Sequence, residues 1–355
     1  CTLVNTLEIG SIVPIANNAF VDCTNIPSAA GFNGDTSWNM DIGPNNISLR
    51  IFGIGKMKDM PSLGAPRWLF DYSTFSDIPV KVDIEEGVLS VGAYSFADCK
   101  NVQSVSLPHT IETIGNSAFQ NCSISSINIP GGVTDIGSSA FNDCMNLTDV
   151  MIQDGVTSIG DYAFSGCTSL TSIIIPDSIT SIGDYIFLDC SALTTAGPIG
   201  GDYNIQLGWT NQIPAFAFKN CDSLISVIIP NNVTSIGEQA FYNCAGLTSV
   251  IIPNSVTSIG ENAFYNCTGL TNVVIPDSVT SIGGDAFQYC AGLTSVIIPA
   301  SVTDIGEWAF HGCDNLTDVY YSGSKEDWAT IDIGRYNDEL TDATIHYNST
   351  GPDGG

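Results

Sequence analysis

Cysteine recurs along this chain at a nearly constant interval. Ten cysteines lie at 99, 122, 144, 167, 190, 221, 244, 267, 290 and 313, so the intervals are 23, 22, 23, 23, 31, 23, 23, 23 and 23 residues. The same phrase surrounds each of them and is clearest at 240–267, AFYNCAGLTSVIIPNSVTSIGENAFYNC. The interval of 31 is one repeat with eight extra residues, which fall within 196–216. Because a unit this short cannot bury its own apolar side chains, neighbouring units must stack.

One repeat predicts two short extended segments and a turn. The β-branched run from Leu247 to Ile252 indicates a strand, which ends at Pro253 because proline cannot donate to a ladder. Val256–Gly260 is a second extended arm, after which Phe264 returns the chain towards the next cysteine. Each coil therefore adds a strand to a parallel sheet. The predicted fold class is a repeat solenoid, mainly β, with coils of 22–23 residues.

Two apolar columns are predicted to form the core of the stack. Each repeat carries one phenylalanine in the turn and one isoleucine in the second arm. The phenylalanines lie at 96, 119, 141, 164, 187, 218, 241, 264, 287 and 310. The isoleucines lie at 114, 136, 159, 182, 213, 236, 259, 282 and 305.

The cysteine column has two interpretations. Bridges between adjacent coils would have to join parallel Cβ vectors in one geometry, which disfavours disulfides. A ladder of free, buried thiols that pack as small apolar side chains is favoured instead. Metal binding is disfavoured further, because no CxxC pair or paired histidine accompanies the cysteines.

The repeat is interrupted at both ends of the chain. Residues 27–80 alternate in polarity around a Gly-Pro-Asn-Asn turn at 43–46, which predicts a β-hairpin. Near the other end, Ser324 is followed by acidic residues typical of a first helical turn, and 343–347 indicate a last strand. The predicted segments are a partial repeat at 1–26, a hairpin-like cap or insertion at 27–80, the solenoid at 81–321, a cap at 322–348 and a tail at 349–355.

The repeat phrase, in the order I-P-x-x-V-T-x-I-G-x-x-A-F-x-x-C-x-x-L, resembles the BspA-like leucine-rich repeats of bacterial surface proteins, of the Treponema pallidum type. The resemblance covers roughly 80–355 together with 1–26. It implies a right-handed leucine-rich-repeat stack with N- and C-terminal caps. It also implies a secreted or wall-attached protein that binds host matrix proteins, other cells or surface glycans. The family has no common catalytic residues, so none is transferred to this chain.

Cys1 and Cys23 also fit the cysteine ladder, with one residue deleted between them. Cys1 is therefore interpreted as the start of a cut or processed chain within an earlier coil, in preference to the lipid-anchored cysteine of a lipoprotein. The N-terminus lacks the basic segment and apolar stretch of a signal peptide.

The charge balance excludes several classes of partner. The chain has 9 Lys+Arg against 37 Asp+Glu, a net charge of −28. Binding to nucleic acid or to anionic lipid needs clustered cations and is not expected. No apolar run approaches the roughly 18–20 residues that span a bilayer. We therefore expect no direct membrane span, and the resemblance implies an extracellular or cell-surface location.

The sequence offers little for catalysis. Its three histidines, His109, His311 and His346, accompany no nucleophile at a meaningful spacing. One acidic residue per coil recurs beside the glycine bend, which is explained by solubility or, alternatively, by Ca²⁺ binding. One carboxylate per coil does not make a cage, so no catalytic, cofactor-binding or metal-binding residue is predicted.

A binding face is predicted on the strands. If Leu247, Val250 and Ile252 point inward, Ser249 and Ile251 point outward, and the same alternation in other coils gives a polar column beside an apolar one. Contiguous exposed apolar surface marks interaction sites, whereas the alternative is that β-branched residues stabilise the sheet or pack on a cap or subunit. The insertion around Tyr203 and Trp209 interrupts both columns, and it is included because insertions in solenoids often lie on binding faces. The candidate ligand-binding residues are Ser172, Ile174, Tyr203, Trp209, Ser226, Ile228, Ser249, Ile251, Asn272, Val274, Ser295, Ile297 and Tyr320.

Three functions are considered for this chain. The favoured hypothesis is a non-catalytic recognition module, an adhesin-type protein that binds a protein or glycan ligand at a cell surface without a cofactor. The alternative is a structural spacer within a larger surface protein. A remote alternative is a polysaccharide-active enzyme on a solenoid. This chemistry needs clustered acidic and basic groups on one face, yet the only Lys or Arg between 101 and 324 is Lys219.

Overall fold

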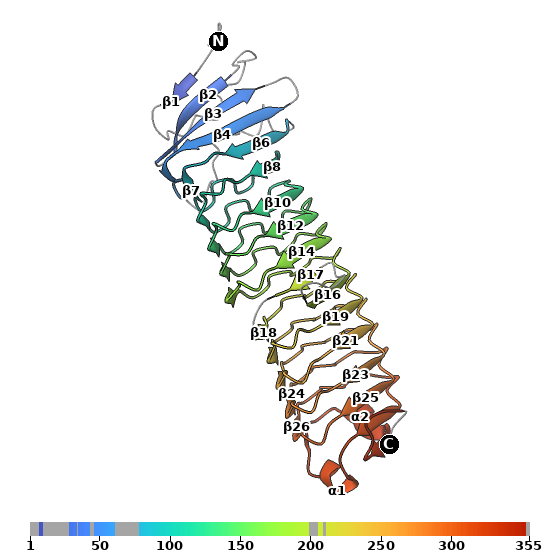
Figure 1. Cartoon of the computed structure of the whole chain (residues 1–355). Helices are drawn as coiled ribbons and strands as arrows, with labels where there is room; N and C mark the ends of the chain where they lie inside the picture. Colours follow the sequence, from blue (N-terminus) through green and yellow to red (C-terminus); the bar gives the residue numbers. More distant parts are fainter. Residues whose placement is uncertain are drawn as a thin grey trace. The chain divides into compact units, whose positions relative to one another are not determined.

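The structure is a computed structural model that describes residues 7–9, 28–33, 35–42, 46–60, 78–198, 205–208 and 211–352. Short strands and tight turns form about 11 coils of about 23 residues. The chain divides into two compact units, Cys1–Leu170 and Thr171–Gly355. Within each unit the coils stack one on the next (Figure 1). The predicted mainly β repeat solenoid is confirmed.

The first unit begins with the predicted hairpin. Strands β2, β3 and β4 are antiparallel, and β4 continues in parallel into β6 and β8. The hairpin therefore shares one sheet with the first coils. The boundaries predicted for the five segments of the chain remain predictions. The strands of this unit are β1 (Leu7–Ile9), β2 (Ser28–Asn33), β3 (Thr36–Ile42), β4 (Ile47–Gly53), β5 (Gly55–Lys56), β6 (Val80–Ile84), β7 (Val88–Val91), β8 (Val102–Ser106), β9 (Thr113–Ile114), β10 (Ser126–Ile129), β11 (Asp135–Ile136), β12 (Asp149–Ile152) and β13 (Ser158–Ile159).

The second unit has two rows of parallel strands. The first row, called here the strand face, consists of β14-β17-β16-β19-β21 and β23-β25-β27-β29. The second row is β18-β20-β22-β24-β26-β28. Its elements are β14 (Ser172–Ile175), β15 (Ser181–Ile182), β16 (Thr195–Pro198), β17 (Ile205–Leu207), β18 (Gln212–Ile213), β19 (Ser226–Ile228), β20 (Ser235–Ile236), β21 (Ser249–Ile251), β22 (Ser258–Ile259), β23 (Asn272–Val274), β24 (Ser281–Ile282), β25 (Ser295–Ile298), β26 (Asp304–Ile305), β27 (Asp318–Tyr321), α1 (Lys325–Trp328), β28 (Asp332–Ile333), α2 (Asp338–Asp342) and β29 (Thr344–Tyr347).

Phenylalanine rings form the predicted core column in each unit. In the second unit Phe241 and Phe264 stack with ring centroids 5.1 Å apart, and Phe264 and Phe287 with centroids 5.2 Å apart. All ten phenylalanines of the column are buried. The isoleucine column is buried as well, except that Ile182, in the strand before the insertion, is only half-buried.

The backbone around each phenylalanine forms three hydrogen bonds to the next coil. In one coil the amides of Gln239, Phe241 and Asn243 donate to carbonyl oxygens of the next coil at 2.9, 2.8 and 2.7 Å. Gln239 and Asn243 have φ of 52° and 60°. These left-handed residues turn alternate amides in one direction along the stack, so every coil presents three N–H donors to its successor.

The cysteines of the described residues form the predicted ladder of free thiols. Cys99 and the nine that follow it to Cys313 are all free and buried. The Cys244 thiol donates to the Phe218 carbonyl oxygen of the preceding coil, with Sγ 3.0 Å from the oxygen. Burial raises the pKa of the Cys144 thiol to about 12. The ladder therefore consists of neutral thiols that supply one weak donor per coil. Cys1 and Cys23 lie outside the described residues.

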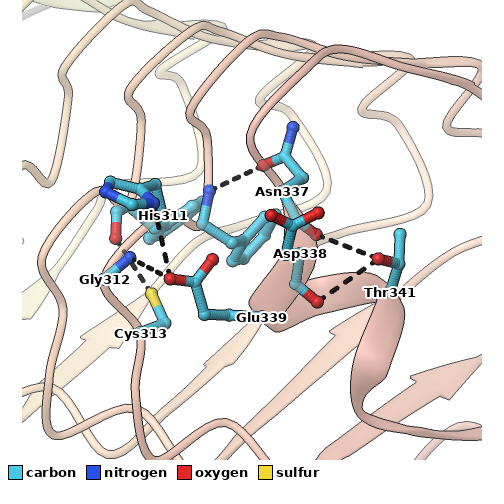
Figure 2. A network of polar contacts seen from close by, with 9 residues as sticks. His311, Gly312, Cys313, Asn337, Asp338, Glu339 and Thr341 are labelled. Atoms are coloured by element: carbon cyan, nitrogen blue, oxygen red, sulfur yellow. Dashed lines mark hydrogen bonds and ion pairs between the residues drawn. The ribbon is translucent and has the colours of Figure 1, made fainter.

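The C-terminal cap replaces the coil that the last repeat lacks. The Trp308 amide still donates to a backbone oxygen, that of Arg335, at 3.0 Å. The next two donors are satisfied by side chains: Phe310 N–H donates to Asn337 Oδ1 at 2.9 Å, and Gly312 N–H to Glu339 Oε1 at 2.8 Å (Figure 2). The predicted helix start at Ser324 and the last strand are confirmed, whereas helix α2, which carries Glu339 and follows Asn337, was not predicted.

Replacing Asn337 with alanine is expected to lower the free energy of unfolding by about 1–3 kcal/mol. The buried amide also donates from Nδ2 to the carbonyl oxygens of Gly306 at 3.0 Å and Gly334 at 2.8 Å. Alanine would therefore leave the Phe310 amide and the Gly334 carbonyl without their partner, and it would leave the Gly306 carbonyl with the Ala309 amide alone. Urea unfolding measures the change, with Asp338→Ala as the control because that neighbouring side chain is exposed. Equal losses in the two variants would contradict the capping role.

Candidate functional site

The strand face of the second unit carries the two predicted columns. Registers place Ser226 opposite Ser249 and Ile228 opposite Ile251. In the following coils Asn272 lies opposite Ser295 and Val274 opposite Ile297. The inward side chains Val227, Val273 and Val296 are buried, so the alternation expected from the sequence is present. The polar column thus consists of Ser172, Ser226, Ser249, Asn272 and Ser295.

Exposure is uneven along the apolar column. The most exposed members are Ile251 at 54% and Val274 at 51%, followed by Ile174 at 37%. Ile228, Ile297 and Tyr320 are half-buried. The exposed apolar surface is therefore centred on Ile251 and Val274.

The insertion interrupts the column through an added strand. Strand β17 lies between β14 and β16 in the same parallel row, with Gln206 opposite both Ile174 and Gly197. A glutamine and a glycine therefore separate Ile174 from the isoleucines further along. The other two predicted residues of the insertion, Tyr203 and Trp209, lie outside the described residues.

The chain's own C-terminal segment covers one end of the face. Asn348 N–H donates to the Gly323 carbonyl oxygen at 2.8 Å, and Ser349 N–H to that of Tyr321 at 3.0 Å. Gly351 is buried, and a methyl group in place of its hydrogen would lie 3.4 Å from Ile297 Cδ1. Residues of the predicted tail thus pack on the array and account for the reduced exposure of Ile297.

Tyr320 is engaged by the last strand. Its ring stacks on His346 of β29 with centroids 4.7 Å apart. His346 Nε2 lies 2.7 Å from Asp318 Oδ1, and this hydrogen bond lowers the pKa of the Asp318 carboxyl. No pattern in the sequence indicated a partner for His346. The register that places it opposite Tyr320 was the missing information.

Aromatic side chains on the turn edge stack on one another. Tyr242 and Tyr265 are parallel with centroids 4.5 Å apart, and Lys219 Nζ lies 4.5 Å from the Tyr242 ring centre. The Tyr242 ring is therefore engaged by Tyr265 and by Lys219, whereas Tyr289 keeps 43% of its surface exposed. Among the described residues no three acidic, histidine or cysteine side chains gather as a metal site would require.

The described helices are short. They comprise four and five residues, and none is long and apolar enough to cross a membrane.

These features together define a leucine-rich-repeat solenoid with an exposed strand face: stacked coils, a row of parallel strands and a core of phenylalanines at a regular spacing. The family model described as "BspA type Leucine rich repeat region" matches residues 70–194 and 211–330 in six copies. The match covers more than half of the chain, so the chain belongs to this family.

Solved structures of leucine-rich repeat proteins are similar to the chain. A leucine-rich cell surface protein from Faecalibacterium prausnitzii is 27% identical, with 85% of this chain and 97% of that chain covered and a TM-score of 0.44. One from Bacteroides ovatus is 24% identical, with 88% and 98% covered and a TM-score of 0.48. The T. pallidum leucine-rich repeat protein is 21% identical, with 65% and 86% covered and a TM-score of 0.41. A search of the curated proteins found no match.

Proposed function

We propose that this chain is a non-catalytic recognition module that acts at a cell surface and binds an extended segment of a partner protein along its strand face. The observation that carries the proposal is the exposed apolar pair Ile251 and Val274, with half of each side chain accessible on adjacent coils. Covering the exposed half of such a side chain contributes on the order of 1 kcal/mol to binding. The adhesin-type role and the surface location rest on what the BspA-type repeat implies.

The face also carries polar groups that suit an extended chain. Ser249 and Asn272 are exposed beside the apolar pair. Hydroxyl and amide side chains can hydrogen-bond the backbone of a segment that lies along the strands. The C-terminal segment at Ile297 supports this arrangement, because an irregular stretch of the same chain already packs on the face there.

Binding is expected to weaken at least tenfold when Ile251→Lys and Val274→Lys are combined. Each lysine would bring a charge into a contact that desolvates an apolar side chain. Solid-phase binding to a panel of matrix proteins (fibronectin, laminin and collagen) measures the effect. The control is Ser258→Lys with Ser281→Lys, which adds the same charge on β22 and β24 of the other row.

The result would contradict the proposal if the strand-face variant and the control bound the panel as well as the unmodified protein. Circular dichroism confirms folding of both variants, since Ile251 and Val274 are half-exposed and their substitution leaves the core intact.

A structural spacer is the second candidate, and the uniformity of the coils favours it. Three backbone hydrogen bonds and one thiol hydrogen bond recur between consecutive coils, and a rod that presents another domain requires such uniformity. A spacer needs no exposed apolar pair, so unchanged binding in the strand-face variant would favour it.

A further inference from the structure

One pair of consecutive coils in the described part of the second unit lacks ladder hydrogen bonds between its strands on the strand face. The sheet that contains β19 ends at β21, and the next sheet begins at β23. On the other row the same coils remain paired through Ser258–Ser281 and Ile259–Ile282. The two coils are therefore in register along one side and unpaired along the other. We call the interrupted hydrogen-bond ladder between residues 248–252 and 271–275 the seam. Strands β21 and β23 still contact each other there, so they must part to admit a further strand.

The threonine before each strand shows the same interruption. Thr248, Thr294 and Thr317 each donate both the amide and the hydroxyl to a carbonyl oxygen of the preceding coil, at 2.9–3.3 Å. In the described residues of the seam, no such bond joins Thr271 to Thr248. The Thr271 hydroxyl instead accepts a hydrogen bond from Asn272 Nδ2, with the atoms 3.5 Å apart.

Solvent reaches one inward side chain at the seam. Val227, Val273 and Val296 are buried to 1% exposure or less, whereas the equivalent Val250 is partly exposed. The most exposed members of the outward column, Ile251 and Val274, lie on the two strands of the seam. An edge with unpaired backbone groups beside apolar side chains is a template for an added strand.

The insertion shows that an extra strand fits between consecutive coils of this unit. Strand β17 is parallel to both β14 and β16 and lies between them. The turns of those coils stay joined nevertheless: Phe187 and Phe218 stack with centroids 5.5 Å apart, and Phe187 N–H donates to the Ala217 carbonyl oxygen at 2.9 Å. The two rings are inclined by 30°, against 2–16° for the stacks that follow. A strand can therefore enter one side while the phenylalanine side holds.

We propose that the seam accepts an extended segment of a partner polypeptide as an added parallel strand between β21 and β23. The proposal deepens the proposed function, on which it rests, by naming the mode of binding. The partner segment is uncharged and rich in β-branched residues, because its inward side chains would meet Val250 and Val273. It lacks proline, because its amides must donate to the open edges.

Hydrogen exchange tests the seam without a ligand. The Thr271 amide is expected to exchange at least tenfold faster than those of Thr248, Thr294 and Thr317, which donate to the preceding coil. Equal protection of the four amides would overturn the proposal.

A covalent lock tests strand entry. Ser249→Cys with Asn272→Cys places two exposed thiols across the seam, which a short bis-electrophile such as dibromobimane can bridge while the native thiols stay buried. The probe is a labelled peptide that copies residues 247–252 between solubilising lysines. It is expected to bind the unlocked protein and to lose at least tenfold in affinity after locking. The matched control bridges Ser226→Cys with Ser249→Cys on the paired strands β19 and β21 and keeps its affinity.

A second peptide with Val250→Pro separates strand addition from apolar adsorption, because proline removes a ladder donor. Absent binding of the first peptide, equal binding of the proline peptide, or undiminished binding to the locked protein would overturn the proposal. If the lysine variant loses matrix-protein binding while the locked protein retains it, the strand-face function stands and the seam proposal fails.

Discussion

Replacing Phe264 with alanine is expected to lower the free energy of unfolding by about 3–5 kcal/mol. The ring is fully buried and stacks on Phe241 and Phe287, with centroids 5.1 and 5.2 Å away. Alanine removes the apolar burial and both ring contacts, and it leaves a cavity that two neighbouring coils must share. Urea unfolding followed by circular dichroism measures the change.

Tyr289→Ala is the control for this prediction. Its ring is 43% exposed and contacts Tyr265 edge-on, with centroids 5.5 Å apart. Such a contact contributes about 0.5–1.5 kcal/mol beyond burial, so its removal is expected to cost less than the loss of Phe264. A Phe264→Ala variant no less stable than this control would show that the phenylalanine column is not the main core of the stack.

Stability is expected to fall steeply above pH 9, because the folded protein keeps thiol protons that the unfolded chain loses. Burial raises the pKa of the Cys99, Cys144 and Cys313 thiols to about 12, and it raises those of Cys122, Cys221, Cys244, Cys267 and Cys290 as well. A raised folded pKa gives stability that is complete below the unfolded value of 9.0 and lost as the pH rises towards the folded value. Each thiol therefore contributes a slope of about −1.4 kcal/mol per pH unit in this window.

The Cys244→Ala variant isolates one thiol of the ladder. Its free energy of unfolding, measured in urea from pH 7 to pH 11, is expected to fall less steeply above pH 9, by about 1.4 kcal/mol per pH unit. Below pH 8 the two curves should run parallel. Tyrosine ionisation adds the same slope to both proteins and cancels in the comparison. Parallel curves above pH 9 as well would mean that the thiol ionises equally in the folded and unfolded chain.

The repeating part of the fold was predictable because every coil must bury the same kinds of side chain. Phe264, Ile259 and Cys244 recur at one spacing, so a single repeat shows which side chains must be buried once the coils stack. The outward position of Ile251 followed from strand alternation in the same way. These predictions depend on the period alone, and the structure confirms them in the described residues.

The ends of the stack were less predictable. The sequence indicated a helix after Ser324 and a last strand. It gave no sign that Asn337 and Glu339 would supply the acceptors that a further coil would provide. The donors concerned belong to Phe310 and Gly312, 27 residues earlier in the chain. Polar side chains in a cap have no periodic neighbours, so no pattern identifies their partners.

The strand face shows the same division. The two columns of the strand face were determined by the sequence itself, since strand alternation and the 23-residue period fix which side chains point outward. Only the tertiary structure decided which members stay exposed: Gly351 covers Ile297, His346 stacks on Tyr320, and Ile251 and Val274 stay exposed where β21 and β23 are not paired with each other. The physical reason is that the repeat specifies what its coils share, whereas exposure depends on how each coil meets its neighbours.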